Sequence, residues 1–154
     1  MEFGLSEDQR LLQDSVGRFL EEQSPLEKVR EAADSNDFVP RGLWDGIREL
    51  GVPGILVPED FGGMGLGFLD AAIISEMIGR HVAPVPYVGT SVMAPVAVTL
   101  AGSEAQKQNW LPKIAAGEVI VGVGVTERVG ARENDGVDAS QGKLSGKALF
   151  VIDW

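Results

Sequence analysis

The segment Gly102–Glu127 constrains the fold most, because its hydrophobic pattern changes period part-way along. Ser103 and Gln106 have the spacing of a capping box, in which each side chain satisfies the other residue's backbone amide at a helix N-terminus. Pro112 predicts a break in this helix or a new first turn, and Gly117 predicts its end. The first half of the segment is therefore helical.

The second half of the segment has the period of a strand. Valine occupies every second position from 119 to 125, and this alternation of β-branched residues predicts a strand over Val119–Thr126. Gly122 and Gly124 leave one face of that strand without side chains. Such a face suits the close approach of another backbone or of a flat ligand, and ordinary sheet packing accounts for the same pattern. The sequence thus predicts a helical part that leads into a β part.

Four or five helices are predicted before residue 117. Ser6 and Gln9 form a second capping box, Pro40 has the place of a first-turn proline, and Gly51 closes the helix that follows it. The residues between 51 and 67 are dense in glycine and proline and predict an ordered loop. The most apolar helix, over residues 88–100, is expected to be buried. The expected helices cover residues 6–23, 43–50, 68–81 and 88–100, with a short helix or exposed turn at 26–33.

One further strand is predicted near the end of the sequence. Residues 136–146 are rich in turn formers, and Lys147–Ile152 has the apolar composition of a strand. Two strands are marginally stable alone. We therefore expect a mainly α chain whose β part is incomplete.

Composition excludes several classes of protein. The formal net charge is −10 and the 13 cations are scattered, whereas nucleic-acid binding depends on clustered Lys and Arg. The sequence has no cysteine, so it can form no disulfide, thiolate nucleophile or Cys-ligated metal site, and it suits a reducing cytoplasm. No apolar run approaches the roughly 18 residues of a membrane span, and the N-terminus lacks an export signal. We expect a cytoplasmic globular protein with no nucleic-acid or membrane partner.

Two features invite a chemical assignment that the sequence does not support. Residues 62–67 read GGMGLG and precede a predicted helix, but their spacing matches neither a dinucleotide-binding fingerprint nor a P-loop. A structural loop that packs helices closely is the better interpretation. His81 is the only histidine and has no partner pattern for a triad or a metal site, so we interpret it as a helix C-terminal residue. We predict no catalytic residue and no metal ligand in this chain.

Several motifs, taken in their order along the chain, resemble the acyl-CoA dehydrogenase family. They span nearly the whole sequence, and the ordered set is specific. The set comprises Trp44 with Glu49-Leu50-Gly51, residues 57–65 (VPEDFGGMG), Glu76 with Ile78-Gly79-Arg80, Gly102-Ser103-Glu104 with Gln106-Lys107, residues 110–114 (WLPKI) with Gly117-Glu118, and Thr126-Glu127.

This resemblance implies an up-and-down N-terminal helical domain over residues 1–117, followed by an incomplete β-barrel-like domain over residues 118–154. In the family, FAD lies between the β domain and a C-terminal helical bundle. A carboxylate of the bundle removes the α-proton of an acyl-CoA thioester, hydride passes to the flavin, and the electrons go to an electron-transfer flavoprotein. The resemblance thus implies α,β-dehydrogenation of acyl-CoA substrates of the fatty-acid or steroid side-chain type. This chain alone is expected to be inactive, because the base would lie beyond Trp154.

The resemblance also implies positions for cofactor contacts. Val123, Val125 and Thr126 match the strand that contacts the flavin in the family. Phe150 begins a segment that resembles the next flavin-contacting strand. These four residues are the expected cofactor-binding residues.

Two departures from the family pattern bear on the function. Arg132 stands in a turn that is small and hydroxyl-bearing in the family, and it is the expected substrate-binding residue. Ile152 replaces a hydroxyl donor, a loss of about 0.5 to 1.5 kcal/mol in flavin binding. With residues 79–86, these departures resemble the heteromeric bacterial members, in which one subunit has a degenerate site. A homo- or hetero-oligomer is expected, and the alternatives to an enzyme are a non-catalytic partner subunit and a helical binding module without a flavin role.

Overall fold

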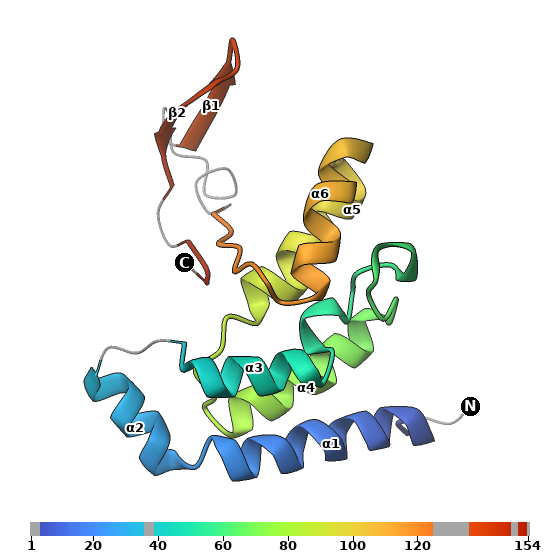
Figure 1. Cartoon of the computed structure of the whole chain (residues 1–154), viewed down its shortest axis with the longest axis vertical. Coiled ribbons are helices and arrows are strands. Elements are labelled where there is room, and N and C mark those ends of the chain that lie inside the picture. The colour runs from blue at the N-terminus through green and yellow to red at the C-terminus, as the bar shows by residue number, and fades with distance from the viewer. Residues whose placement is uncertain (1–3, 36–38, 125–135, 149–150, 154) are drawn as a thin grey trace.

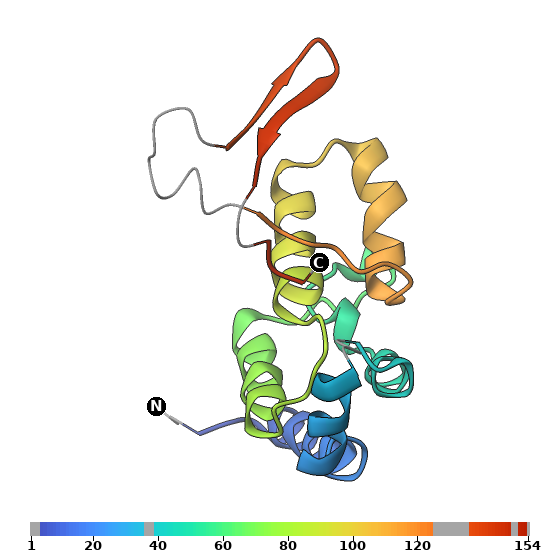
Figure 2. The same ribbon diagram turned by 90° about the vertical axis from the view of Figure 1, so that its left-hand side faces the viewer.

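The computed structural model describes residues 4–35, 39–124, 136–148 and 151–153, and these form a mainly helical chain with one hairpin. Helices α1, α3 and α4 make the lower layer of Figure 1, and α5 and α6 stand above it as an antiparallel pair. Figure 2 shows the hairpin at the far end from α1. The helices are α1 (Glu7–Gln23), α2 (Leu26–Ser35), α3 (Arg41–Glu49), η1 (Val52–Gly54), η2 (Glu59–Phe61), α4 (Phe68–Arg80), η3 (Val88–Met93), α5 (Ala94–Ala101) and α6 (Glu104–Ala115).

Both predicted capping boxes are confirmed. The backbone amide of Ser6 donates to the Gln9 side chain at 3.1 Å, and the amide of Gln9 donates to the Ser6 hydroxyl at 3.1 Å. Ser103 and Gln106 repeat this exchange at the start of α6. The helix predicted for residues 68–81 is confirmed by α4, and α2 decides the alternative at 26–33 in favour of a helix.

The break predicted at Pro112 is wrong, because α6 continues through it to Ala115. Proline removes one hydrogen bond of the helix, but the packing around it compensates. Leu111 and Ile114 are buried on either side of it, at 0% and 1% exposure. The C-terminus of α6 is also held by α3, since Trp44 Nε1 donates to the Gly117 carbonyl oxygen at 3.2 Å. Gly117 ends the helix as predicted, with φ of 63°.

The helix predicted for residues 88–100 has a different geometry. Its first part, η3, is a π-helical turn, and only Ala94–Ala101 is α-helical. Pro95 supplies no backbone amide to the turn before it, which is where the irregular hydrogen bonding occurs. The expected burial holds for only part of this segment: Gly89–Ser91, Ala94 and Pro95 are buried, whereas Leu100 is 82% exposed.

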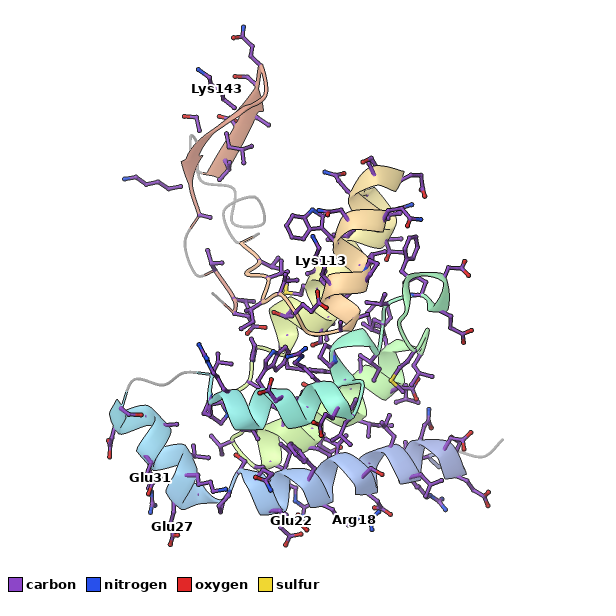
Figure 3. The ribbon with its side chains drawn as sticks, in the orientation of Figure 1. Arg18, Glu22, Glu27, Glu31, Lys113 and Lys143 are labelled. Carbon is purple, nitrogen blue, oxygen red and sulfur yellow. The ribbon has the colours of Figure 1, made fainter. Side chains whose placement is uncertain are left out.

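The core consists of two adjoining clusters. The larger one joins α1, α3 and α4 around Leu20, Ile47 and Ile74, each fully buried. The smaller one joins α5 and α6 to the loop residue Val57. Charged side chains cover the outer faces: Figure 3 shows Glu22 of α1 and Glu31 of α2 pointing away from the protein. Of the described helices, none combines the length and the apolar character needed to cross a membrane.

The β structure differs from the prediction. The hairpin pairs β1 (Gly136–Ser140) with β2 (Lys143–Lys147), largely within the turn-rich residues 136–146, where no strand was predicted. Gln141 and Gly142 have φ of 49° and 72°, and two left-handed residues form the turn that best matches strand twist. Only Lys147 and Ile152 of the predicted second strand have β partners among the described residues. Residues 119–122 belong to no sheet, and Val123 forms a single bridge.

Candidate functional site

The two segments expected to contact a flavin meet at one residue pair. The Val123 amide donates to the Ile152 carbonyl oxygen at 2.9 Å, and the Ile152 amide donates to the Val123 carbonyl oxygen at 3.0 Å. This antiparallel bridge closes a junction between the helical part and the last residues of the chain. We treat this junction, made by residues 89–90, 121–124 and 151–153, as the candidate site.

The extended segment at the junction keeps the predicted alternation of faces. Val119, Val121 and Val123 are half-buried against the α5–α6 cluster, and the residues between them are exposed. At Gly124, an added Cβ would lie 3.0 Å from the Ala148 Cβ and 3.3 Å from Val151 Cγ2. Side chains of the returning chain therefore fill the space beside Gly124, which favours ordinary packing over the close approach of another backbone.

Two side chains of the junction bind backbone groups on the opposite segment. Thr90 is fully buried, and its hydroxyl accepts from the Val121 amide at 3.0 Å and donates to the Val121 carbonyl oxygen at 3.4 Å. The Asp153 carboxylate accepts from the amides of Gly89 and Thr90 in η3, the latter at 3.1 Å. The only carboxylate of the junction is thus bound to backbone amides of the protein itself.

Tyr87 fixes the start of η3 against α4. Its side chain is 2% exposed, and its hydroxyl donates to the Ala71 carbonyl oxygen at 2.8 Å. Burial raises the pKa of the Tyr87 hydroxyl far above its ordinary value, because the charged form would lose its hydration. The hydroxyl therefore acts as a neutral donor that positions η3.

A cleft of about 400 Å³ opens beside the junction. Its walls are Val39, residues 83–86, Ile120, Val151 and Asp153. Apart from the Asp153 carboxylate, the side chains are apolar, and that carboxylate is already hydrogen-bonded. The cleft therefore suits an apolar group better than a charged one.

Of the expected cofactor-binding residues, only Val123 lies in the described part of the chain. Both of its backbone polar groups are used by Ile152, and its side chain packs against the α5–α6 cluster. Val125, Thr126 and Phe150 lie outside the described residues, as does the expected substrate-binding residue Arg132. Their roles remain predictions.

Sequence reasoning missed Thr90 and Asp153. Their side chains bind backbone groups 31 and 63 positions away along the chain, so no local spacing reveals them. The glycine before Thr90 was the available signal, because glycine permits close backbone approach. Among the described residues, no group of acidic or histidine side chains could hold a metal ion, and His81 caps the C-terminus of α4 as predicted.

The chain belongs to the acyl-CoA dehydrogenase family. Residues 6–118 match the family model described as "Acyl-CoA dehydrogenase, N-terminal domain". This match covers α1 to α6 and ends one residue after Gly117, where α6 gives way to the extended segment. The family resemblance and the mainly helical fold predicted from the sequence are both confirmed.

Individual relatives extend the comparison. Mitochondrial isovaleryl-CoA dehydrogenase of Pongo abelii is 38% identical over 127 residues, which cover 80% of this chain and 30% of the relative. A chain of the ChsE4-ChsE5 complex from Mycobacterium tuberculosis superposes with a TM-score of 0.72 at 28% identity, over 78% of this chain and 33% of that one. An acyl-CoA dehydrogenase complexed with FAD from Bacillus anthracis gives a TM-score of 0.60 at 25% identity, over 78% and 20% of the two chains. This chain thus spans about a third or less of these relatives.

Proposed function

We propose that residues 1–117 form the N-terminal helical domain, and residues 118–154 the first part of the central β domain, of an FAD-dependent acyl-CoA dehydrogenase. The reaction is the α,β-dehydrogenation of an acyl-CoA thioester, and an electron-transfer flavoprotein accepts the electrons. The match of residues 6–118 to the family's N-terminal domain supports this proposal most strongly. The cytoplasmic location expected from the cysteine-free sequence belongs to the same proposal.

In this proposal the chain contributes support rather than proton transfer. The larger core cluster holds α1, α3 and α4 together, and Tyr87 ties η3 to α4. Thr90 and Asp153 then attach the β segments to η3. A rigid helical support of this kind holds a binding site in place through packing. The catalytic base of the assembled protein would lie outside this chain.

The described residues do not by themselves fit FAD. The backbone amide and carbonyl groups of Val123 are both hydrogen-bonded to Ile152, and the space beside Gly124 is filled by Ala148 and Val151. The cofactor proposal therefore depends on Val125, Thr126 and Phe150 and on parts of the assembled protein outside this chain. For this reason we expect the 154-residue chain to be inactive alone.

A dehydrogenation assay of the assembled protein tests the proposal. The chain is produced with its own downstream reading frame, or with an acyl-CoA dehydrogenase-like chain encoded beside it, and assayed with acyl-CoA thioesters beginning with isovaleryl-CoA. A dye serves as electron acceptor. We expect turnover by the assembly and none by the chain alone. Turnover by the chain alone contradicts the placement of the base, and an assembly that is folded, flavin-free and inactive contradicts the enzyme proposal.

A second candidate function is that of a non-catalytic subunit that completes a partner's site. The similarity to a chain of the ChsE4-ChsE5 complex favours it, together with Ile152 in place of a hydroxyl donor. The side chain of Ile152 is 38% exposed and adds no polar group to the junction. If this candidate is correct, replacing Ile152 by Thr leaves activity unchanged, because the working flavin belongs to the partner chain. An increase in flavin retention by the variant favours the enzyme instead.

A further inference from the structure

The β pairing at the junction is too short to fix its own register. One residue pair, Val123 with Ile152, joins the two extended segments among the described residues. A slip of one residue in such a pairing turns every side chain of a segment to its other face. In this chain a slip would exchange Ile152 with Val151 or Asp153 opposite Val123. Some other contact must therefore select the observed register.

Two side-chain contacts flank the bridge, one on each side of it. Both involve the consecutive residues Gly89 and Thr90 of η3. The Thr90 hydroxyl exchanges two hydrogen bonds with the backbone of Val121, two residues before the bridge. The Asp153 carboxylate, one residue after Ile152, accepts from the Gly89 and Thr90 amides. The η3 turn is thus hydrogen-bonded to both extended segments. A one-residue slip of residues 151–153 would break both hydrogen bonds of the Asp153 carboxylate.

The backbone of η3 is shaped for this contact. A Cβ at Gly89 would lie 2.8 Å from the Ile152 carbonyl oxygen and 3.0 Å from the Asp153 Cβ, so a side chain there would push the segment away. Asp153 itself has φ of 60°, a left-handed conformation that Asp and Asn adopt more readily than most residues. Charge-assisted hydrogen bonds to backbone amides are stronger than neutral ones, which suits this contact to hold the conformation.

We propose that Asp153 is a positioning residue that fixes the register of residues 151–153 against residues 121–123. It acts through the Gly89 and Thr90 amides of η3. The consequence for a cofactor rests on the proposed function: Asp153 would set which residues of the second strand face the flavin. The register itself is independent of that function.

Amide hydrogen exchange of the whole chain, measured residue by residue by NMR, tests the proposal. Asp153→Gly removes the carboxylate and keeps the left-handed φ accessible, and Asp153→Asn retains an oxygen acceptor. Asp138→Gly is the matched control, since Asp138 is exposed on β1 and no side-chain hydrogen bond of it is present among the described residues. We expect protection of the Val123 and Ile152 amides to fall at least about tenfold in Asp153→Gly. A tenfold fall corresponds to a decrease of about 1.4 kcal/mol in the free energy of local opening at the bridge. Protection should fall less in Asp153→Asn, whose neutral oxygen accepts weaker hydrogen bonds. In Asp138→Gly it should stay within about threefold of the wild type, a change of about 0.7 kcal/mol or less.

Protection in the larger core separates positioning from general destabilisation. The amides of α1 and α4 should be unchanged in all variants, because α1 and α4 pack in the larger core cluster and not at the junction. Unchanged junction protection in Asp153→Gly overturns the proposal, and so does an equal loss in Asp138→Gly. Loss of junction protection confined to Asp153→Gly supports the register proposal even if the assembly retains no FAD. In that case the proposed function is contradicted and the register proposal is not. Normal FAD retention by the assembly with unchanged protection overturns the register proposal alone.

Discussion

Replacing Gly63 by alanine should damage the glycine-rich loop far more than the same change at its neighbour. The backbone of Gly63 does not have positive φ, so its need for glycine is purely steric. An added Cβ would overlap the Val57 carbonyl oxygen and lie 2.5 Å from the Val57 carbonyl carbon. These are backbone atoms of a fully buried residue, so they cannot rotate away.

The cost follows from the bonds that the loop must loosen. The Gly65 amide donates to the Val57 carbonyl oxygen at 2.9 Å, and the Met64 amide donates to the Gly54 carbonyl oxygen at 2.8 Å. Weakening these two bonds costs about 0.5 to 1 kcal/mol each, and overpacking adds about 1 to 3 kcal/mol. We therefore expect Gly63→Ala to destabilise the chain by about 3 kcal/mol, a fall in Tm of roughly 6 to 12 °C for a chain of this length.

Gly62→Ala is the matched control. Gly62 has φ of 80° with no atom within 4 Å of an added Cβ, so alanine there meets only the left-handed penalty of about 1 kcal/mol. Thermal and denaturant unfolding followed by circular dichroism measures both variants. The reasoning is refuted if Gly63→Ala is no more destabilising than Gly62→Ala, because the loop would then not be packed against Val57.

Three further predictions concern stability. Tyr87→Phe should cost about 1 kcal/mol at neutral pH. Because burial raises the Tyr87 pKa, the folded wild type should lose stability as pH rises past about 10, and the variant should lose less. Tyr87 is the only tyrosine, so tyrosinate absorbance of the folded chain appearing near its ordinary pKa contradicts this. Val82→Asn should raise the free energy of unfolding by about 0.5 to 1 kcal/mol in denaturant unfolding, because the 60%-exposed Val82 has the left-handed φ of 49°, which asparagine adopts more easily. A decrease in stability would show that packing of the valine side chain stabilises the fold. Ser103→Ala should cost about 1 kcal/mol, similar to Ser6→Ala at the other capping box, and no change in either would mean that the boxes do not stabilise their helices.

The helical part could be predicted because its signals are local. Ser6, Ser103, Gly51 and Gly117 act on the backbone of their own helix ends, and the apolar spacing of α1 and α4 follows directly from the helical period. Pro112 misled because the burial of Leu111 and Ile114, which outweighs one lost hydrogen bond, is a tertiary effect.

The hairpin and the junction could be predicted much less well. The hairpin depends on the Gln141-Gly142 turn rather than on apolar residues, since β2 is exposed along its whole length. The junction depends on Thr90 and Asp153, whose partners are distant along the chain. The family resemblance assigned Val123 and the segment of Ile152 to flavin-contacting strands, but it did not predict the bridge between these two residues.

The central claim is that this chain provides a helical support and only part of a flavin site. The most direct measurement is the visible absorption spectrum of the purified chain after incubation with FAD and desalting, with circular dichroism to establish that it is folded. We predict a folded chain with far less than one equivalent of flavin, and close to one equivalent when the assembled protein is treated in the same way. A chain that retains about one equivalent alone contradicts the account, because the residues from Val123 onward would then complete a cofactor site without any further domain.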